Sequence, residues 1–256
     1  MYSTDLGLTT QDLGLSAGLP SNLPSSPLSL PVSNQSVFTT NLANCMKIRL
    51  LLTLFGGLVL SAMAGAQNNV TRSLPSFNKI AISGGYDAVL LQEGSSEGVT
   101  LELNGVDADK IITEVKGSTL EIGMKKGSYN GAKIRMTITY KKLKEIASSG
   151  SSNIEALSVI KGNEFEIATS GSGDFKGTFD VKDLDVAISG SSKMVLKGSA
   201  AEQEFAVSGS GNIDAGDLTG KTAEVAISGS GNVLVGVDGP VQSAVSGSGK
   251  VTSKKK

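Results

Sequence analysis

The sequence contains no histidine, no tryptophan, a single cysteine and only 4% aromatic residues. Without histidine there is no imidazole general base, no serine–histidine nucleophile pair and no histidine-ligated metal site. Its one cysteine, Cys45, forms neither an internal disulfide bond nor a cysteine-rich zinc site. A net charge of −1 gives no electrostatic reason to bind nucleic acid or an anionic membrane. Glycine, by contrast, is abundant, with 32 residues, and the composition is typical of a Gly/Ser-rich all-β protein.

Residues 46–66 have the three parts of a secretory signal peptide. A basic start, Met46-Lys47-Ile48-Arg49, precedes an apolar run over 50–60, and small residues lead to Ala66. The alternative is a transmembrane helix. From Leu50 to Ala64 the apolar stretch is about 15 residues, or roughly 22 Å as a helix, which is short for a hydrocarbon layer of ~30 Å. We therefore expect cleavage after Ala66 and no membrane span in the mature chain, residues 67–256.

Residues 1–45 differ in composition from the rest of the chain. They hold four of the six prolines and no lysine or arginine. Because a signal peptide works from the N-terminus, we expect translation to begin at Met46, so that residues 1–45 come from a start codon assigned too early. The alternative is a disordered extension, which this Pro/Ser-rich composition also allows. In both cases Cys45 lies outside the mature protein.

A Ser-Gly-Ser anchor repeats along the mature chain at intervals of about 20 residues. From Gly150 onward the first glycines are 21, 19, 19, 20 and 18 residues apart, and a variant copy, Ser83-Gly84-Gly85, precedes them. These turn glycines are Gly84, Gly150, Gly171, Gly190, Gly209, Gly229 and Gly247. Two residues before the first serine, every copy has an alanine: Ala81, Ala147, Ala168, Ala187, Ala206, Ala226 and Ala244. Each repeat thus has a strand of period 2, a Gly/Ser turn and a second strand.

A β-rich unit this short cannot bury its apolar side alone, so it must stack on its neighbours. Propeller blades need about 40 residues, and the consensus of leucine-rich repeats is missing. The pattern predicts an all-β fold, a single-stranded parallel β-helix (β-solenoid) with coils of about 20 residues. Its large apolar residues would point inward, the alanine ladder would lie where neighbouring faces approach closely, and glycine would supply the positive φ of a corner.

The stretch 98–140 has no anchor but continues the alternation of apolar residues, and we expect it to form further coils. Residues 107–115 are the exception and are expected to form a short helix or an irregular excursion. A stacked fold of this kind has two open ends, each a template for edge pairing. The C-terminal Lys254-Lys255-Lys256 either blunts one of them or is simply a solvated tail.

No motif in the repeats indicates catalysis. The Gly/Ser turns recur between strands, whereas a phosphate-binding loop needs one turn that leads into a helix and ends in Lys-Ser/Thr. A calcium-binding β-roll needs an acidic residue in every turn, and two of the corresponding positions are Lys193 and Lys250. An isolated cation site near Asp174 or Asp214 stays open. So does the competing hypothesis of a carbohydrate-active enzyme, whose acids would come from Asp174, Asp180, Asp183 and Asp185.

The turns Ser208-Gly209-Ser210-Gly211-Asn212-Ile213 and Ser228 to Val233 resemble those of the putative auto-transporter adhesin, head GIN domain family. The segment Phe77 to Leu90 resembles the family's entry strand and turn, and so does Gly117 to Ile122. The resemblance covers about Phe77 to Val251. It implies an exported right-handed β-solenoid with an adhesive or surface role, and it brings no catalytic residues with it. The chain departs from the family at its end, where Val251-Thr252-Ser253 leads straight into lysines.

Taken together, the residues and the resemblance predict an exported, non-enzymatic β-solenoid that works as an adhesin-like or envelope-associated binding or structural module. No cofactor or metal is expected. A glycan or a protein of the envelope or cell surface is the expected partner, and the expected location is periplasmic, outer-membrane-associated or extracellular. A third hypothesis is an envelope scaffold that oligomerises through the ends of its solenoid.

Overall fold

The computed structural model describes residues 68–254 of the chain. All described residues belong to one compact unit, Ala64–Lys256. The segment 1–45, the signal peptide over 46–66 with its cleavage point at Ala66, and Cys45 lie outside the described residues. Within the described part, no helix has the length and apolar character needed to cross a membrane.

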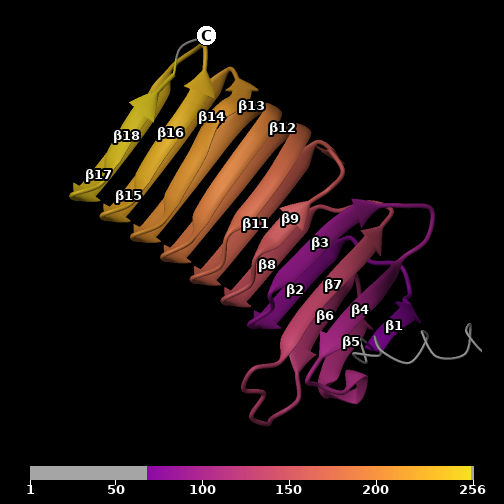
Figure 1. Ribbon diagram of the computed structural model, residues 1–256. Coiled ribbons are helices and arrows are strands. Elements are labelled where there is room, and N and C mark those ends of the chain that lie inside the picture. The colour runs from indigo at the N-terminus through magenta and orange to yellow at the C-terminus, as the bar shows by residue number, and fades with distance from the viewer. Residues whose placement is uncertain (1–67, 255–256) are drawn as a thin grey trace, which may run out of the picture. The chain divides into compact units, whose positions relative to one another are not determined.

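The described residues form strands and one short 3-10 helix, so the prediction of an all-β solenoid is confirmed (Figure 1). The elements before the regular repeats are β1 (Asn68–Ser73), β2 (Lys79–Gly84), β3 (Ala88–Glu93), β4 (Gly98–Asn104), η1 (Ala108–Lys110), β5 (Ile111–Lys116), β6 (Thr119–Met124) and β7 (Lys133–Tyr140). The repeats form β8 (Glu145–Gly150), β9 (Ile154–Ala156), β10 (Ile160–Lys161), β11 (Glu164–Gly171), β12 (Phe175–Gly190), β13 (Lys193–Gly209), β14 (Asn212–Gly220), β15 (Thr222–Gly229), β16 (Asn232–Val237), β17 (Val241–Gly247) and β18 (Lys250–Ser253).

Two ladders of parallel strands run the length of the stack. The anchor ladder contains the strands that lead into the Gly/Ser turns and their neighbour β6, in the order β6, β2, β8, β11, the second half of β12, the second half of β13, β15 and β17. The return ladder contains the strands after the turns, in the order β7, β3, β9, the first half of β12, the first half of β13, β14, β16 and β18. Each strand is therefore paired with the equivalent strand of the next coil.

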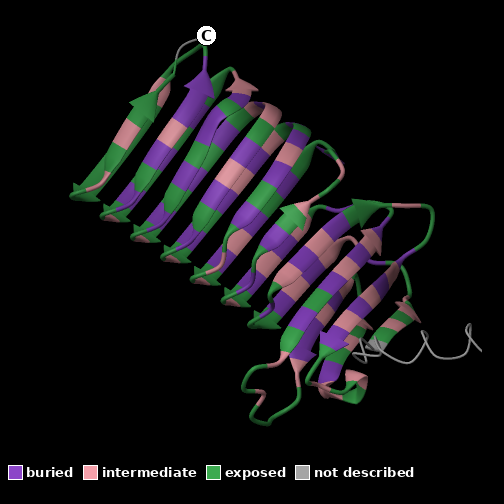
Figure 2. Cartoon of the chain, viewed as in Figure 1, coloured by how far each residue is buried: buried purple, intermediate pink, exposed green. Residues whose placement is uncertain are grey.

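The core lies between the two ladders and follows directly from the period of 2. In Figure 2 buried and exposed residues alternate along the strands. Phe165, Phe175 and Phe205 are at most 1% exposed, as the alternation predicts. The ring of Phe179 lies 5.5 Å from that of Phe165 and 6.2 Å from that of Phe175, measured between centroids. Because each aromatic side chain buries a large apolar area, this cluster is a main source of stability.

The turn glycines stack on one another at one edge of the anchor ladder. All seven have φ between +117° and +136°, a region that residues with a Cβ rarely adopt. Successive turns are hydrogen-bonded to one another, as where the Ser210 N–H donates to the Gly190 carbonyl oxygen at 2.9 Å. A Cβ on Gly209 would lie 2.6 Å from that same oxygen. Glycine is thus required twice, by its backbone conformation and by the close approach of the coil beneath.

The stretch 98–140 does not continue the coils in chain order, so our expectation for it is confirmed only in part. Strand β4 pairs antiparallel with β1 and β7, and β5 pairs antiparallel with β6. Strands β6 and β7 do form a layer of the stack, but it lies on the far side of β2 and β3, which are held between β6/β7 and β8/β9. Residues 107–115 contain the expected short helix, η1, but from Ile111 onward they form strand β5 instead of an irregular excursion.

Candidate functional site

A long groove follows the outer face of the anchor ladder. Its volume is about 1050 Å³, and it is lined along the stack by the alanine column and by the serine column two residues later. The register pairs Ala81 with Ala147 and continues without a break to Ala226 and Ala244. At the other end Glu121 stands beside Ala81 and takes the place of an alanine. The result is a flat floor of methyl groups bordered by hydroxyl groups.

The alanines face outward, which differs from our expectation that they lie between closely packed faces. Ala187, Ala206 and Ala226 are exposed, whereas the residues on either side of each alanine point into the core. In a strand, neighbouring residues point to opposite faces. Because the large apolar residues on either side of each alanine point inward, the alanine points outward. The turn glycines end each anchor strand beside the groove.

Two residues before the alanines, the same face carries a column of carboxylates that sequence reasoning missed. Its members are Glu145, Glu166, Asp185, Glu204 and Glu224, each paired with the next along the ladder. Adjacent strands lie ~4.8 Å apart, so these like charges are close neighbours. The signal was present in the sequence, because every member stands four residues before the first serine of its anchor. A shorter second column, Glu164, Asp183 and Glu202, runs beside it.

The electrostatics of the first column differ at its end and in its middle. At one end Lys79 takes the place of an acid and forms an ion pair with Glu145, and the hydrogen bond to that carboxylate raises the pKa of Lys79. In the middle, partial burial raises the pKa of Asp185, and the nearby carboxylates, Glu204 foremost, raise it further. The column is therefore a strip of negative charge along the groove. Lys79 neutralises this charge only at the Glu145 end.

A second, smaller hollow of about 300 Å³ lies over the two carboxylate columns near the C-terminal end of the stack. Carboxylates from three successive coils line it: Asp183, Asp185, Glu202, Glu204 and Glu224. Gln203 also borders it but is buried, and its side-chain nitrogen donates to the carbonyl oxygens of Ala200 and Leu218.

The four acids of the enzyme hypothesis are not brought together. Asp183 and Asp185 line the small hollow, but the other two have local roles elsewhere. Asp174 accepts a hydrogen bond from the Lys193 N–H at 3.2 Å, and Asp180 accepts one from the Ser199 hydroxyl at 3.2 Å.

No group of three metal-ligating side chains close enough to hold a cation occurs among residues 68–254. At the two candidate cation positions, the carboxylates bind backbone instead: Asp214 accepts the Gly216 N–H at 3.2 Å, and Asp174 is the acceptor described above.

Comparison with known proteins places the fold and the family. The chain is similar to solved structures titled as putative adhesins from Bacteroides fragilis NCTC 9343 (19% identity, TM-score 0.64, 75% of this chain and 98% of that one) and Parabacteroides merdae ATCC 43184 (22%, 0.57, 75% and 97%). It is also similar to a structure titled as a putative lipid binding protein from Parabacteroides distasonis ATCC 8503 (22%, 0.54, 75% and 98%). At 19–22% identity, these similarities establish the fold alone. No curated protein matches the sequence. Residues 76–256 match the family described as "Putative auto-transporter adhesin, head GIN domain", and the chain belongs to that family.

Proposed function

We propose that the chain is an exported, non-enzymatic, adhesin-like module that binds a protein of the cell envelope or cell surface along the groove of its anchor ladder. The observation that carries the proposal is the groove itself, a continuous apolar floor that spans the coils from Ala81 to Ala244. Membership of an adhesin family supports a binding role, and the signal-like segment 46–66 supports export.

The chemistry of the groove favours an extended protein segment over a sugar. No aromatic ring is among the residues that line it, so a sugar ring would find no flat aromatic face on which to stack. The floor instead offers methyl groups, which bind small apolar side chains by excluding water. The carboxylate column beside the floor would attract lysine and arginine side chains of the same partner. A segment that alternates small apolar and basic residues fits both features.

The test is binding of the labelled, exported chain to intact cells of the producing organism. We expect saturable binding that is lost when the cells are treated with protease. Ala206→Gln, which fills the floor without changing charge, should weaken binding at least ~10-fold, or about 1.4 kcal/mol. Glu204→Gln should weaken binding at low salt and reduce its dependence on salt. The control is Thr252→Gln, a similar exposed change on the return ladder, which should bind like the wild type.

Three results would each reject the proposal. Binding that survives protease but is lost after oxidation of cell-surface sugars would indicate a glycan partner. Binding to protein-free lipid vesicles with the same affinity would indicate the ligand class named for the Parabacteroides distasonis protein. Turnover of a polysaccharide by the exported chain would establish the enzyme hypothesis.

A further inference from the structure

The last coil, β17 and β18, leaves core positions uncovered. In the column that follows the alanines, Ile188, Val207 and Ile227 are at most 3% exposed, but the equivalent Val245 of β17 is 44% exposed. In the column that precedes the alanines, the exposed Ser243 of β17 follows the buried Phe205 and Val225. Among residues 68–254 no strand pairs with the outer edge of β17, so its outward-pointing backbone groups have no strand partner.

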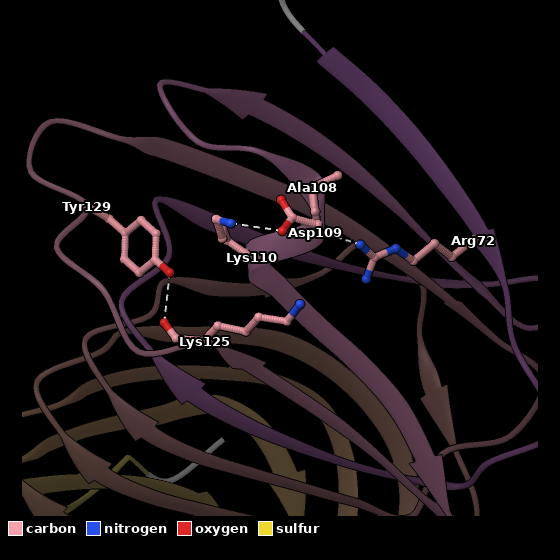
Figure 3. A network of polar contacts seen from close by, with 6 residues as sticks. All are labelled: Arg72, Ala108, Asp109, Lys110, Lys125 and Tyr129. Carbon is pink, nitrogen blue, oxygen red and sulfur yellow. Dashed lines mark hydrogen bonds and ion pairs between the residues drawn. The ribbon is translucent and has the colours of Figure 1, made fainter.

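The opposite end of the stack is built differently, and in the described part of the chain no coil of the repeat lies open there. There the antiparallel strands β1 and β5 cover the edges of β4 and β6. The Arg72 guanidinium on β1 reaches across to η1 and β5 and donates to the Ala108 carbonyl oxygen at 2.6 Å and the Ile111 carbonyl oxygen at 2.8 Å. Figure 3 shows Arg72 directed toward Ala108 on η1, beside the Asp109–Lys110 ion pair. The two ends therefore differ: one presents a coil of the repeat, and the other presents the antiparallel strands β1 and β5.

Strand β17 also lacks the charges that protect an exposed edge. Natural edge strands use charged side chains to prevent pairing with other chains. Strand β17 reads Val-Gln-Ser-Ala-Val-Ser-Gly and contains no charged residue. The carboxylate column reaches Glu224 in the coil before and ends at Gln242 in β17. Charge is found instead on the neighbouring strand, where Lys250 begins β18 and Lys254 follows it.

We propose that β17 is an interaction edge for a second copy of this chain, which pairs through its own β17 in the antiparallel direction. The uncovered side of the last coil is the surface that every earlier coil presents to its neighbour. The surface that fits it is therefore another uncovered coil of the same repeat. The first-coil end presents the antiparallel strands β1 and β5 in place of a repeat coil, so the match is the β17 edge of another molecule. Two such edges form an isologous pair about a two-fold axis, and association stops at two copies.

The alternation of side chains fixes the register of this pair. Inward-facing Ser243 and Val245 must meet inward-facing residues of the second copy, so the axis passes through a residue position and not between two. Pairing over the full length of Val241–Gly247 places Ala244 on the axis. Such an axis is parallel to the sheet normal, so the grooves of both copies open on the same side and the alanine column continues from one copy into the other.

The first test is the mass of the full chain in solution, expressed with its own N-terminus and purified after export. Analytical ultracentrifugation should show a dimer. Val245→Lys places a charge at an uncovered core position and should raise the dimer dissociation constant at least ~10-fold. The matched control is Ile112→Lys, which changes a 38%-exposed apolar residue on β5 at the opposite end and should leave the dimer intact. Circular dichroism of both variants checks that each is folded.

The second test is a cross-link at the axis. Antiparallel partners on a two-fold axis have Cα atoms about 4.5–5.5 Å apart, which a disulfide bond can span. In a Cys45→Ser background, Ala244→Cys should give a covalent dimer on mild oxidation, whereas Ala206→Cys, in the middle of the same column, should not. A monomer at ~100 µM, a dimer insensitive to Val245→Lys, or one broken by Ile112→Lys would each refute the pairing through β17.

Discussion

Neutralising the centre of the carboxylate column should stabilise the fold at neutral pH. Asp185 lies between Glu166 and Glu204 in the register, at strand spacings of ~4.8 Å. Two unit charges ~6 Å apart in water repel by about 0.7 kcal/mol, and like charges on adjacent strands cost about 0.2–1 kcal/mol. With two such neighbours, Asp185→Asn should raise the free energy of unfolding by about 0.5–1.5 kcal/mol at low ionic strength.

The raised pKa of Asp185 predicts how the stability gained by Asp185→Asn changes with pH. Burial and neighbouring carboxylates raise the pKa of Asp185 in the folded state, so the folded state binds more protons than the unfolded state in that range. Stability therefore falls as the pH rises through the pKa of Asp185. The gain from Asp185→Asn should be full at neutral pH and should shrink as the pH falls and the wild-type carboxyl becomes protonated.

Urea denaturation of the wild type and Asp185→Asn measures this difference at neutral and acidic pH, and in low and high salt. Asp180→Asn is a matched control in the same strand, because Asp180 pairs in register with Lys161 and Ser199 instead of with acids. It should not stabilise the protein. If Asp185→Asn is no more stable than the wild type at neutral pH and low salt, the carboxylate column is not a source of repulsion.

Three further variants test the core, the first-coil end and an ion pair. Phe205→Ala, at a fully buried position, should lower the free energy of unfolding by about 3–5 kcal/mol in urea denaturation. Arg72→Ala removes charge-assisted hydrogen bonds to two carbonyl groups and should cost about 2–4 kcal/mol, measured in the same way. The pKa of Glu97 is lowered by the Ser76 hydroxyl and by Lys141, so its stabilising effect is lost as the pH falls; Glu97→Gln should flatten the acid limb of a stability–pH curve.

The sequence predicted the regular coils well because one measurable period determines them. Anchors about 20 residues apart align equivalent residues in successive coils, and the alternation of residues such as Phe205 and Val207 identifies the inward face. What failed was the pairing of 98–140. A period of 2 is the same in parallel and antiparallel strands, so the alternation of Leu101 and Leu103 showed a strand but not its neighbours.

The candidate site was predicted only in part. The alanine column was found because one residue type recurs. Its outward direction was not predicted, because a methyl group suits either face of a strand and the direction is determined by the larger neighbours. The carboxylate column was missed because its members are a mixture of Asp and Glu, so no single residue type recurs in it. Its pattern is one of charge and not of residue type, because Asp185 and Glu204 carry the same carboxylate group at the same position of the repeat.

The placement of β2 and β3 between layers that follow them in the chain has a consequence for how the protein can be shortened. Ile80 meets Leu120 on one side and Ile146 on the other, so the earliest layer is complete only after both later segments have been synthesised. Deleting the last coil exposes another coil of the same kind, and truncation there should proceed stepwise. Deleting β2 and β3 removes an interior layer, so shortening from that side should abolish folding at once.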